Sequence, residues 1–455
     1  MRDYNRGYYC SASTKSSYLF PPLDLLFMSG IVRDAGHEVC FIDCIAEKID
    51  AQRAIERVEA FRPDCVVALC GIVSWDADRA FLRGLRARDK TLIVVSGDVF
   101  LETPREIMEK EEWIDGVLLD FTNSDINSLL DGNTGLIDNM AFRRDNDIIE
   151  KRSTTPPPGG VFELPVPMHE LCVSRRYRHP FTRCTPLTSV LTTFGCPYHC
   201  YFCVADKIPF KYRKAQNVID ELDYIHEIGI REILFFDFTF GVPKEDRKKL
   251  CMMMIDKKYN YSWSCYSRVD VLDEEMLDAF KGSGCHTIMF GVESGEDEIL
   301  KRYNKGLDRE KIKETFRLCK GKGIDTVGTF ILGGPFDTGE SCRETVRFAK
   351  ELGSDYASFN IAVPRPLTEY RKEAVAGNVI QDSDLNFDHS GNERARGTES
   401  LSGDEIRRLR RYAIRSFYLR PGYMIRRVGK VRSWHQLLEL ISNGIGLLKN
   451  YLHFN

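Results

Sequence analysis

The sequence predicts an α/β protein in which an open parallel sheet precedes a partial barrel of strands and helices. Two observations lead to this prediction. Short apolar runs alternate with helical segments over residues 1–150 and again over 188–370, and this alternation is typical of parallel sheets whose strands are joined by helices. Between the two series, residues 151–187 are rich in Pro and Arg, which favours a linker. Residues 371–455 are expected to form a helical, basic C-terminal region.

The first domain is expected to begin with a helix over 20–32, because Pro21 and Pro22 suit its first turn and apolar residues recur at helical spacing. Gly36 ends this helix. The next elements are expected as strands at 38–43, 65–70, 91–96 and 115–119, with helices near 51–61 and 76–88. Residues 1–18 show no clear period and are expected to form a loop. The pattern predicts a parallel sheet with helices on both faces.

The second domain is expected to hold six strand–helix units, fewer than the eight of a closed barrel. Its strands are predicted at 189–194, 232–236, 262–265, 287–291, 326–332 and 356–362, and its helices at 217–228, 243–258, 273–282, 309–322 and 339–352. We therefore expect a partial (β/α)6 barrel. In such sheets the chemistry lies at the C-terminal ends of the strands.

The composition is that of a globular protein and excludes several classes. Apolar residues make up 43% and charged residues 29% of the 455 residues, and the net charge of −3 excludes a uniformly basic protein. The 15 cysteines are dispersed and often lie in apolar runs, as at Cys65, Cys70 and Cys285, which favours a reducing interior over a disulfide scaffold. Neither an apolar leader nor a run of about 18 apolar residues is seen. The sequence therefore predicts a cytoplasmic protein.

Three cysteines, Cys196, Cys200 and Cys203, lie within eight residues at the spacing C-x3-C-x2-C, directly after the first strand of the second domain. Three thiolates on one short loop can bind three irons of a cubane iron–sulfur cluster, because soft sulfur ligands suit iron. The fourth iron is then open to another ligand. A zinc site is disfavoured, since zinc usually takes paired C-x2-C units and no second pair follows. Buried structural thiols are the remaining alternative.

Polar residues and glycines follow the later strands of the second domain where each strand ends. The second strand ends in a carboxylate and a hydroxyl, the third in a cation, the fourth in a carboxylate between glycines and the fifth in a Gly-Gly-Pro turn: these are Asp237 and Thr239, Arg268, Glu293, and Gly333 and Gly334. An acid for an ammonium group, a cation for a carboxylate, an acid for ribose hydroxyls and an apolar edge for a base would suit an amino-acid nucleoside. A single strand-end acid is more often a helix cap or solvated, so the inference rests on the whole set.

The cysteine loop, with the aromatic Phe202 before its last cysteine, resembles the signature of the radical S-adenosylmethionine (SAM) superfamily, and the resemblance extends over about residues 188–370. By this resemblance Cys196, Cys200 and Cys203 bind a [4Fe–4S] cluster and SAM chelates the open iron. Reductive cleavage then gives methionine and a 5′-deoxyadenosyl radical that abstracts hydrogen from the substrate. An electron donor such as flavodoxin or ferredoxin is expected as a partner.

The resemblance also implies which residues contact SAM. The expected cofactor-binding set is Phe202, Asp237, Thr239, Arg268, Glu293, Gly333 and Gly334. Glu293 most resembles the ribose-binding residue of the family. Asp237 and Thr239 occupy the position near the SAM amino group, and Arg268 is expected to reach the SAM carboxylate. No residue beyond the cluster ligands is assigned a catalytic role.

The N-terminal domain resembles the Rossmann-like, cobalamin-binding type of domain that precedes the barrel in one large branch of this superfamily. Residues 20–26, 35–39 and 41–43 match its opening. The domain departs from the pattern because it lacks an apolar first strand before residue 18 and a D-x-H-x-x-G motif. It also has 96–98 and 120–123 where the branch has turns rich in Gly and Glu. Cobalamin binding therefore stays open, and without cobalamin the domain would shape the substrate entrance.

The sequence thus predicts a radical SAM enzyme, an oxidoreductase or transferase, that acts on an apolar substrate such as a lipid, an isoprenoid or a tetrapyrrole. A cobalamin-dependent C-methyltransferase is the alternative. The tail between residues 401 and 432 has ten Arg or Lys residues against two acids, interleaved with apolar residues. This pattern favours contact with an anionic membrane surface, which would place the enzyme at the inner membrane face. Packing of the tail on the barrel is the other explanation.

Two further functions are disfavoured. A radical RNA methylthiotransferase carries a second cysteine triad in its N-terminal domain, whereas the N-terminal cysteines here lie mostly on expected core strands, so no nucleic-acid partner is expected. Auxiliary C-terminal clusters are excluded because no cysteine follows Cys342, and Cys172 and Cys184 are expected to be structural. A non-catalytic iron–sulfur or zinc module would leave the SAM-shaped set of strand-end residues without a purpose.

Overall fold

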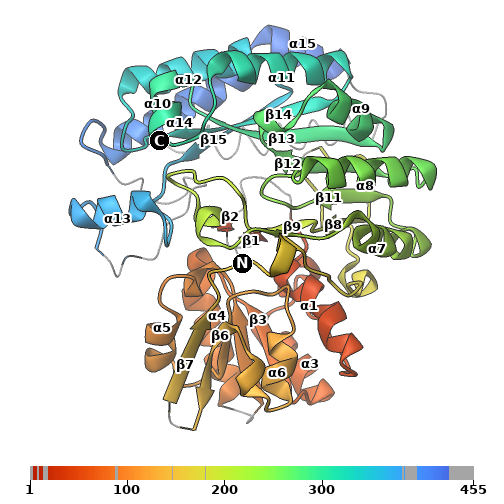
Figure 1. The fold of residues 1–455 in the computed structure, drawn as a ribbon. Helices are drawn as coiled ribbons and strands as arrows, with labels where there is room; N and C mark the ends of the chain where they lie inside the picture. The colour runs from red at the N-terminus through yellow and green to blue at the C-terminus, as the bar shows by residue number, and fades with distance from the viewer. Residues whose placement is uncertain are drawn as a thin grey trace.

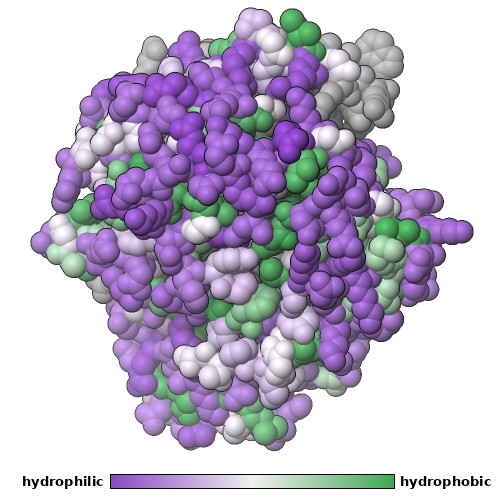
Figure 2. Space-filling model, turned by 45° about the horizontal axis from the view of Figure 1, so that its top comes forward, coloured by the Kyte–Doolittle hydropathy of each residue, from purple (hydrophilic) through white to green (hydrophobic). Residues whose placement is uncertain are grey.

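The computed structural model describes residues 4–7, 10–13, 19–87, 91–145, 147–179, 181–381, 384 and 397–429. Two α/β units lie one above the other in Figure 1, with the N-terminal unit at the bottom. The predicted α/β class and its parallel sheets are confirmed. The face seen in Figure 2 is mostly hydrophilic, with scattered hydrophobic side chains. None of the helices in the described ranges has the length and apolar character of a membrane span.

The N-terminal unit is built on a five-stranded sheet in the order β3-β4-β5-β6-β7. Its strands are β3 (Cys65–Leu69), β4 (Leu92–Ser96), β5 (Gly116–Leu118), β6 (Asn139–Arg144) and β7 (Asp147–Arg152). Its helices are α1 (Leu23–Asp34), α2 (Cys44–Glu47), α3 (Ala51–Phe61), α4 (Trp75–Arg86), α5 (Pro104–Lys110) and α6 (Asp125–Leu130). The first three strands are parallel, and β6 and β7 continue the sheet antiparallel. The sheet is therefore mixed, and the sequence did not predict the hairpin that makes it so.

Two expectations for this unit are wrong. Residues 38–43 form no strand, because β3 is the edge of the sheet, none of these residues is buried, and Asp43 instead caps α2 by accepting from the N–H groups of Ile45 and Ala46. The expected N-terminal loop contains a two-stranded hairpin, β1 (Tyr4–Gly7) and β2 (Cys10–Ser13).

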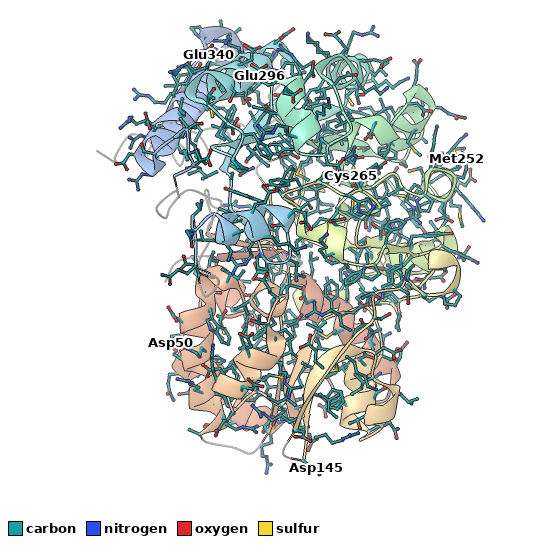
Figure 3. The ribbon with its side chains drawn as sticks, turned by 60° about the vertical axis from the view of Figure 1, so that its left-hand side comes forward. Asp50, Asp145, Met252, Cys265, Glu296 and Glu340 are labelled. Atoms are coloured by element: carbon teal, nitrogen blue, oxygen red, sulfur yellow. The ribbon has the colours of Figure 1, made fainter. Side chains whose placement is uncertain are left out.

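The second unit contains six parallel strands in the order β8-β11-β12-β13-β14-β15. These are β8 (Leu187–Val190), β11 (Glu232–Phe235), β12 (Ser262–Ser267), β13 (Cys285–Glu293), β14 (Asp325–Leu332) and β15 (Tyr356–Ile361). The helices α7 (Ala215–Glu227), α8 (Lys244–Asp256), α9 (Glu274–Gly282), α10 (Asp297–Arg302), α11 (Arg309–Gly321) and α12 (Gly339–Glu351) connect them. The main core lies between these helices and the outer face of the sheet, and it includes Cys265, which Figure 3 labels.

The linker and the segment before α1 fill part of the inner face of this sheet. One buried cluster combines these two segments and α1 with inward side chains of four strands: Leu19, Leu26, Cys172, Tyr177, Leu187, Leu234, Met289 and Val327. His179 is buried between the rings of Phe20 and Phe181, and burial lowers its pKa to about 3, so the imidazole is neutral. The N-terminal half of the inner face is therefore closed by packed side chains.

In the described part of the chain, three helices follow the last strand: α13 (Glu369–Ala376), α14 (Gly403–Tyr418) and α15 (Pro421–Gly429). Ser402 and Glu405 form a capping box at the start of α14, which fixes where that helix begins. The helix α14 packs on α12 and β15, and its Ile406 and Phe417 belong to the main core. The last part of the expected helical C-terminal region, residues 430–455, lies outside the described residues.

Candidate active site

The cysteine loop leaves the C-terminal end of β8 and is held by a carboxylate from the neighbouring strand. Asp237 Oδ1 accepts hydrogen bonds from the backbone N–H groups of Thr192 and Thr193, each at 2.7 Å, and Asp237 Oδ2 accepts one from Thr192 Oγ1 at 2.6 Å. Asp237 is buried, and this burial raises its pKa. Gly195 turns the loop with φ +74°, where a Cβ would lie 2.6 Å from the Ile208 carbonyl oxygen. Asp237 and Gly195 together set the direction in which the loop presents its cysteines.

The three cysteines occupy a short turn that is partly shielded from solvent. Cys200 is buried, and Cys196 and Cys203 are half-buried. The Cys203 N–H donates to the Cys200 carbonyl oxygen at 3.0 Å, which keeps these two residues close. Burial raises the pKa of Cys203 to about 12 and also raises that of Cys200. The thiolates therefore need a positive partner such as iron.

Among the described residues, no three His, Cys, Asp or Glu side chains surround the position of a single metal ion. A cubane cluster makes no such demand, because each iron is held by its own thiolate. Thr239, one of the predicted contacts, lies beside the loop, with its Oγ1 3.6 Å from the Cys196 sulfur.

Arg268 reaches from the end of β12 to the same loop. Its Nη1 donates to the Cys200 sulfur at 3.7 Å, and its guanidinium lies 3.8 Å from the centre of the Tyr198 ring. Asp270 accepts from Nε and Nη2 of Arg268 at 2.9 and 2.8 Å. Nη2 also donates to the Lys305 carbonyl oxygen at 2.6 Å. Arg268 is thus a fixed cation beside the middle cysteine.

Glu293 lies inside the sheet because of a local irregularity in β13. The pairing register with β14 shifts between Gly291 and Glu293, and Glu293 has φ +68°. Such bulges redirect side chains next to functional sites. The carboxylate accepts a hydrogen bond from Lys305 Nζ at 2.8 Å, and both side chains are buried. Burial alone would lower the pKa of Lys305, but the Glu293 carboxylate raises it above its usual value.

Gly291 makes room for this pair. A Cβ at Gly291 would lie 2.4 Å from Glu293 Oε1 and 2.8 Å from Lys305 Nζ, so a side chain here would displace one of the two groups. Lys305 also lies over the ring of Phe202, with Nζ 5.9 Å from the ring centre. Lys305 thus links Phe202, Glu293 and Arg268 beside Cys200.

The Gly333-Gly334 turn packs tightly against an aromatic side chain. The Gly334 N–H donates to Asp337 Oδ2 at 2.8 Å, and a Cβ at Gly334 would lie 1.9 Å from Tyr303 Oη. Tyr303 Oη is buried and has no hydrogen-bond partner among the described residues. The Tyr303 ring meets the Phe202 ring edge to face with centres 5.2 Å apart, which links the turn to the cysteine loop. An unpaired buried hydroxyl between two predicted contact sites suits a polar ligand.

The inner face of the sheet is accessible near the C-terminal ends of β14 and β15. Thr329 and Ile331 on β14, and Ser358 and Asn360 on β15, are half-exposed and alternate with buried outward residues. Because side chains alternate between the faces of a strand, all four point away from the helical layer. They add two hydroxyls, an amide and an apolar side chain to the site, and no motif in the sequence indicates them.

Lys305 and Tyr303 were also missed by the sequence analysis. Both lie in the connection between α10 and α11, away from any strand end. The signal that could have found them is local: the loop returns to the cysteine segment, where the Tyr201 N–H donates to the Tyr303 carbonyl oxygen at 3.0 Å and Asn304 Nδ2 donates to the His199 carbonyl oxygen at 2.6 Å. Asp237 was predicted to lie near the SAM amino group, and both of its carboxylate oxygens accept hydrogen bonds from Thr192 and Thr193 at the start of the loop.

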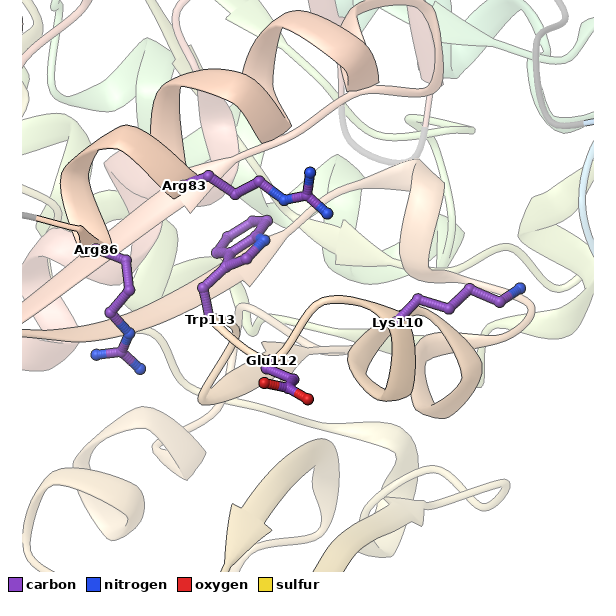
Figure 4. Close-up of a pocket in the computed structure, with 5 residues that line it drawn as sticks. All are labelled: Arg83, Arg86, Lys110, Glu112 and Trp113. Carbon is purple, nitrogen blue, oxygen red and sulfur yellow. The ribbon is translucent and has the colours of Figure 1, made fainter.

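A hollow of about 440 Å³ lies on the N-terminal unit, far along the chain from the cysteine loop. Figure 4 shows its lining residues, Arg83, Arg86, Lys110, Glu112 and Trp113. Arg83 forms an ion pair with the buried Glu111, and Arg86 donates hydrogen bonds to both carboxylate oxygens of Asp115. These arginines are engaged in fixing the ends of α4 and β5, so the hollow has the character of a structural surface feature.

The sequence matches one family model and several known proteins. Residues 190–349 match the model of the radical SAM superfamily. An uncharacterised methyltransferase of Pyrococcus horikoshii is 29% identical over 418 residues, which cover 89% of each chain. An anaerobic magnesium-protoporphyrin IX monomethyl ester cyclase of Rubrivivax gelatinosus is 23% identical over 398 residues, covering 80% of this chain and 68% of the relative.

Two solved structures share the fold over most of the chain. The radical SAM methyltransferase TsrM from Kitasatospora setae, with cobalamin and a [4Fe–4S] cluster bound, superposes with a TM-score of 0.65 at 20% identity and covers 79% of this chain and 72% of TsrM. The cobalamin-dependent radical SAM enzyme OxsB, with aqua-cobalamin and SAM bound, superposes with a TM-score of 0.69 at 15% identity, covering 96% of this chain and 70% of OxsB. The similarity therefore includes the N-terminal unit as well as the six-stranded sheet.

Proposed function

We propose that this chain, whose residues 190–349 match the radical SAM superfamily, uses a [4Fe–4S] cluster and SAM and is a cobalamin-dependent methyltransferase acting on a carbon of a small biosynthetic substrate. The relative from Pyrococcus horikoshii, which is named a methyltransferase, supports the reaction type. The fold shared with TsrM and OxsB over both units supports the cofactor. The alternative that the sequence left open is thus preferred to hydrogen abstraction from an apolar substrate without cobalamin.

When bound, the cluster and SAM supply a 5′-deoxyadenosyl radical, and cobalamin supplies a carrier for the methyl group. The residues of this chain hold and orient these groups. Cys196, Cys200 and Cys203 are the proposed iron ligands, on a loop that Asp237 fixes. Arg268 beside Cys200 offsets negative charge at the middle ligand. A low-potential flavodoxin or ferredoxin is the proposed electron donor.

The residues around Cys200 suit SAM. Its ribose hydroxyls need a buried acceptor, which Glu293 offers, and its carboxylate needs a cation, which Arg268 and Lys305 offer. Tyr303 Oη is a buried polar atom without a partner among the described residues, as expected for a site that takes a polar ligand. We assign Thr239, Phe202 and the Gly333-Gly334 turn as further contacts.

The edge of the N-terminal sheet that faces the second unit suits a ligand with hydrogen-bond donors. Asp24, at the start of α1, is buried, and its Oδ2 accepts from Ser96 Oγ at 2.7 Å at the end of β4. Its Oδ1 is buried without a partner among the described residues. Amide and hydroxyl groups, which cobalamin carries around its ring and on its nucleotide, would satisfy this oxygen. We propose that the N-terminal unit is the Rossmann-like, cobalamin-binding type of domain and that the second unit is a partial (β/α)6 barrel.

The half-exposed inner side chains of β14 and β15 are the proposed substrate contacts. Ile331 offers an apolar surface, and Ser358 and Asn360 offer hydrogen-bonding groups. This mixture fits a largely apolar substrate with a few polar substituents, such as a tetrapyrrole. Cyclisation of a tetrapyrrole side chain is the second candidate function, supported by the relative from Rubrivivax gelatinosus.

The alignment with a methyltransferase over 89% of both chains is the observation that carries the proposal. The test is anaerobic reconstitution with iron, sulfide and hydroxocobalamin, followed by gel filtration. We expect about four irons and about one cobalamin per chain, and 5′-deoxyadenosine together with S-adenosylhomocysteine when SAM, a strong reductant and a tetrapyrrole substrate are added.

The products formed and the metal bound distinguish methyl transfer from the other functions. 5′-Deoxyadenosine without S-adenosylhomocysteine, from a protein that retains no cobalamin, would favour cyclisation or hydrogen abstraction over methyl transfer. Protein that holds only two irons, or that binds zinc tightly, would contradict the radical SAM assignment of the three cysteines.

A further inference from the structure

The helices α14 and α15 carry a strong local excess of positive charge. Between Ile406 and Gly429 the sequence has eight Arg residues and no Asp or Glu, although the whole chain has a net charge of −3. Both helices lie in the upper part of the molecule in Figure 1, away from the N-terminal unit. A ligand attracted by charge is therefore expected to meet this end of the protein first.

Some of these arginines serve the fold. Arg410 is buried and donates from Nε to the Phe359 carbonyl oxygen at 2.9 Å. Arg427 lies 4.2 Å from the centre of the Tyr356 ring. These inward arginines fix α14 and α15 against β15, so the outward residues are held on a rigid support.

The outward residues form a mixed basic and apolar surface. Arg408, Arg411 and Arg415 follow one another at helical spacing along the solvent side of α14, with Arg408 and Arg415 exposed and Arg411 half-exposed. Exposed apolar side chains also lie on α14, on α15 and between the two helices: Tyr412, Leu419, Met424 and Ile425, of which Ile425 is 74% exposed. The upper part of the surface in Figure 2 shows the same mixture of hydrophilic side chains with single hydrophobic ones. We call these seven residues the tail surface.

We propose that the tail surface binds the headgroups of an anionic phospholipid bilayer. The three arginines meet lipid phosphates, and Leu419, Met424 and Ile425 enter the boundary between headgroups and acyl chains. Apolar side chains beside a basic helical face are the pattern of interfacial binding, in which electrostatic attraction and apolar burial add. An acidic protein or an RNA would use the arginines but would leave Ile425 and Met424 without an apolar environment. This proposal does not depend on methyl transfer.

The test uses the full-length protein and extruded vesicles separated by flotation. Wild type is expected to float with vesicles of equal phosphatidylglycerol and phosphatidylcholine but not with phosphatidylcholine alone, and raising the salt should release it. The triple variant Arg408→Glu/Arg411→Glu/Arg415→Glu should bind anionic vesicles about 100-fold more weakly. The double variant Met424→Ser/Ile425→Asp should bind about tenfold more weakly.

Matched controls on other faces are available. Arg62→Glu/Lys110→Glu/Lys249→Glu changes the net charge equally at exposed positions, and Met252→Asp replaces an exposed apolar residue on α8, which Figure 3 labels. Both controls should bind like wild type.

Three results would overturn the proposal. These are equal binding to neutral and anionic vesicles, equal losses in the control and tail-surface variants, and retention of RNA or an acidic protein without vesicle binding. If a tail-surface variant does not fold, the salt titration of wild type decides alone, because binding to anionic vesicles that is insensitive to salt contradicts the role of the arginines.

Discussion

Lys305 Nζ donates a hydrogen bond to Glu293 Oε1 at 2.8 Å, while the carbonyl oxygen of the same lysine accepts one from Arg268. One residue thus joins the predicted ribose-binding carboxylate to the cation beside Cys200. Glu293 is held in a left-handed backbone conformation at φ +68°. The Lys305 ammonium group stabilises the buried charge of its carboxylate.

Replacing Lys305 by Met should lower the free energy of unfolding of the apoprotein by about 3 kcal/mol, because Glu293 would be buried without its cation. SAM binding, measured by calorimetry, should also weaken. The double variant Lys305→Met/Glu293→Gln should recover part of the stability but not the affinity for SAM. Lys301→Met, at an exposed position of α10, is the control and should change neither quantity.

Replacing Gly291 by Ala should weaken SAM binding by about tenfold or more, since the new methyl group would collide with Glu293 Oε1 and Lys305 Nζ. The control is Gly321→Ala at the end of α11, where a Cβ meets nothing within 4 Å. Calorimetric titration with SAM checks both variants. Unchanged affinity in Gly291→Ala would show that the Glu293–Lys305 pair does not contact the cofactor.

Replacing Asp237 by Asn should reduce the iron bound after reconstitution, because the neutral amide accepts from the two loop N–H groups more weakly than the carboxylate and turns a donor toward Thr192 Oγ1, which itself donates to Asp237. A loss of about 2 kcal/mol in stability should accompany it. Iron analysis and chemical denaturation measure the two effects. Asp223→Asn, which removes an exposed ion pair with Lys257, should leave the iron content unchanged.

Replacing Cys200 by Ala should reduce 5′-deoxyadenosine formation to background, since one iron of the cluster would lose its ligand. Cys319→Ala removes a buried thiol from the outer core and should retain activity with a stability loss of about 1 kcal/mol. Product analysis after incubation with SAM and a strong reductant distinguishes them. Activity in Cys200→Ala at the level of Cys319→Ala would contradict the assigned ligands.

Asp24 should make the stability of the N-terminal unit dependent on pH. Burial raises its pKa from 3.8 to about 7, so the folded protein retains a proton that the unfolded chain releases. Stability from this group is complete below about pH 4 and is lost as the pH rises to 7, by up to about 4 kcal/mol. Asp24→Asn should flatten this dependence, and urea unfolding of the apoprotein at pH 5 and pH 8 checks it. Parallel pH profiles of the two proteins would refute this role of Asp24.

The sequence predicted the parts of the site whose positions follow from strand ends. Arg268 and Glu293 end neighbouring parallel strands, so the sheet brings them together whatever the helices between them do. Lys305 and Tyr303 could not be placed this way, because they lie in a connection whose path depends on hydrogen bonds to the cysteine loop. One of these bonds runs from Asn304 Nδ2 to the His199 carbonyl oxygen, 105 residues earlier in the chain.

The fold showed the same division. The six parallel strands followed from local apolar runs, but residues 38–43, with an equally apolar pattern, form no strand. A strand needs a neighbour to pair with, and the identity of neighbours is not a local property. The antiparallel strands β6 and β7 were not predicted, because the alternation of strands and helices gave no sign that a hairpin would pair with β5.

The linker side chains that pack around Tyr177 and His179 close the inner face of the second sheet at the N-terminal ends of its strands. Inner side chains of β14 and β15 near the C-terminal ends of the strands are half-exposed, so we expect a ligand that reaches this face to enter from that end. If SAM, substrate and products all use this entrance, they bind and leave one after another, and the slowest of these steps limits turnover.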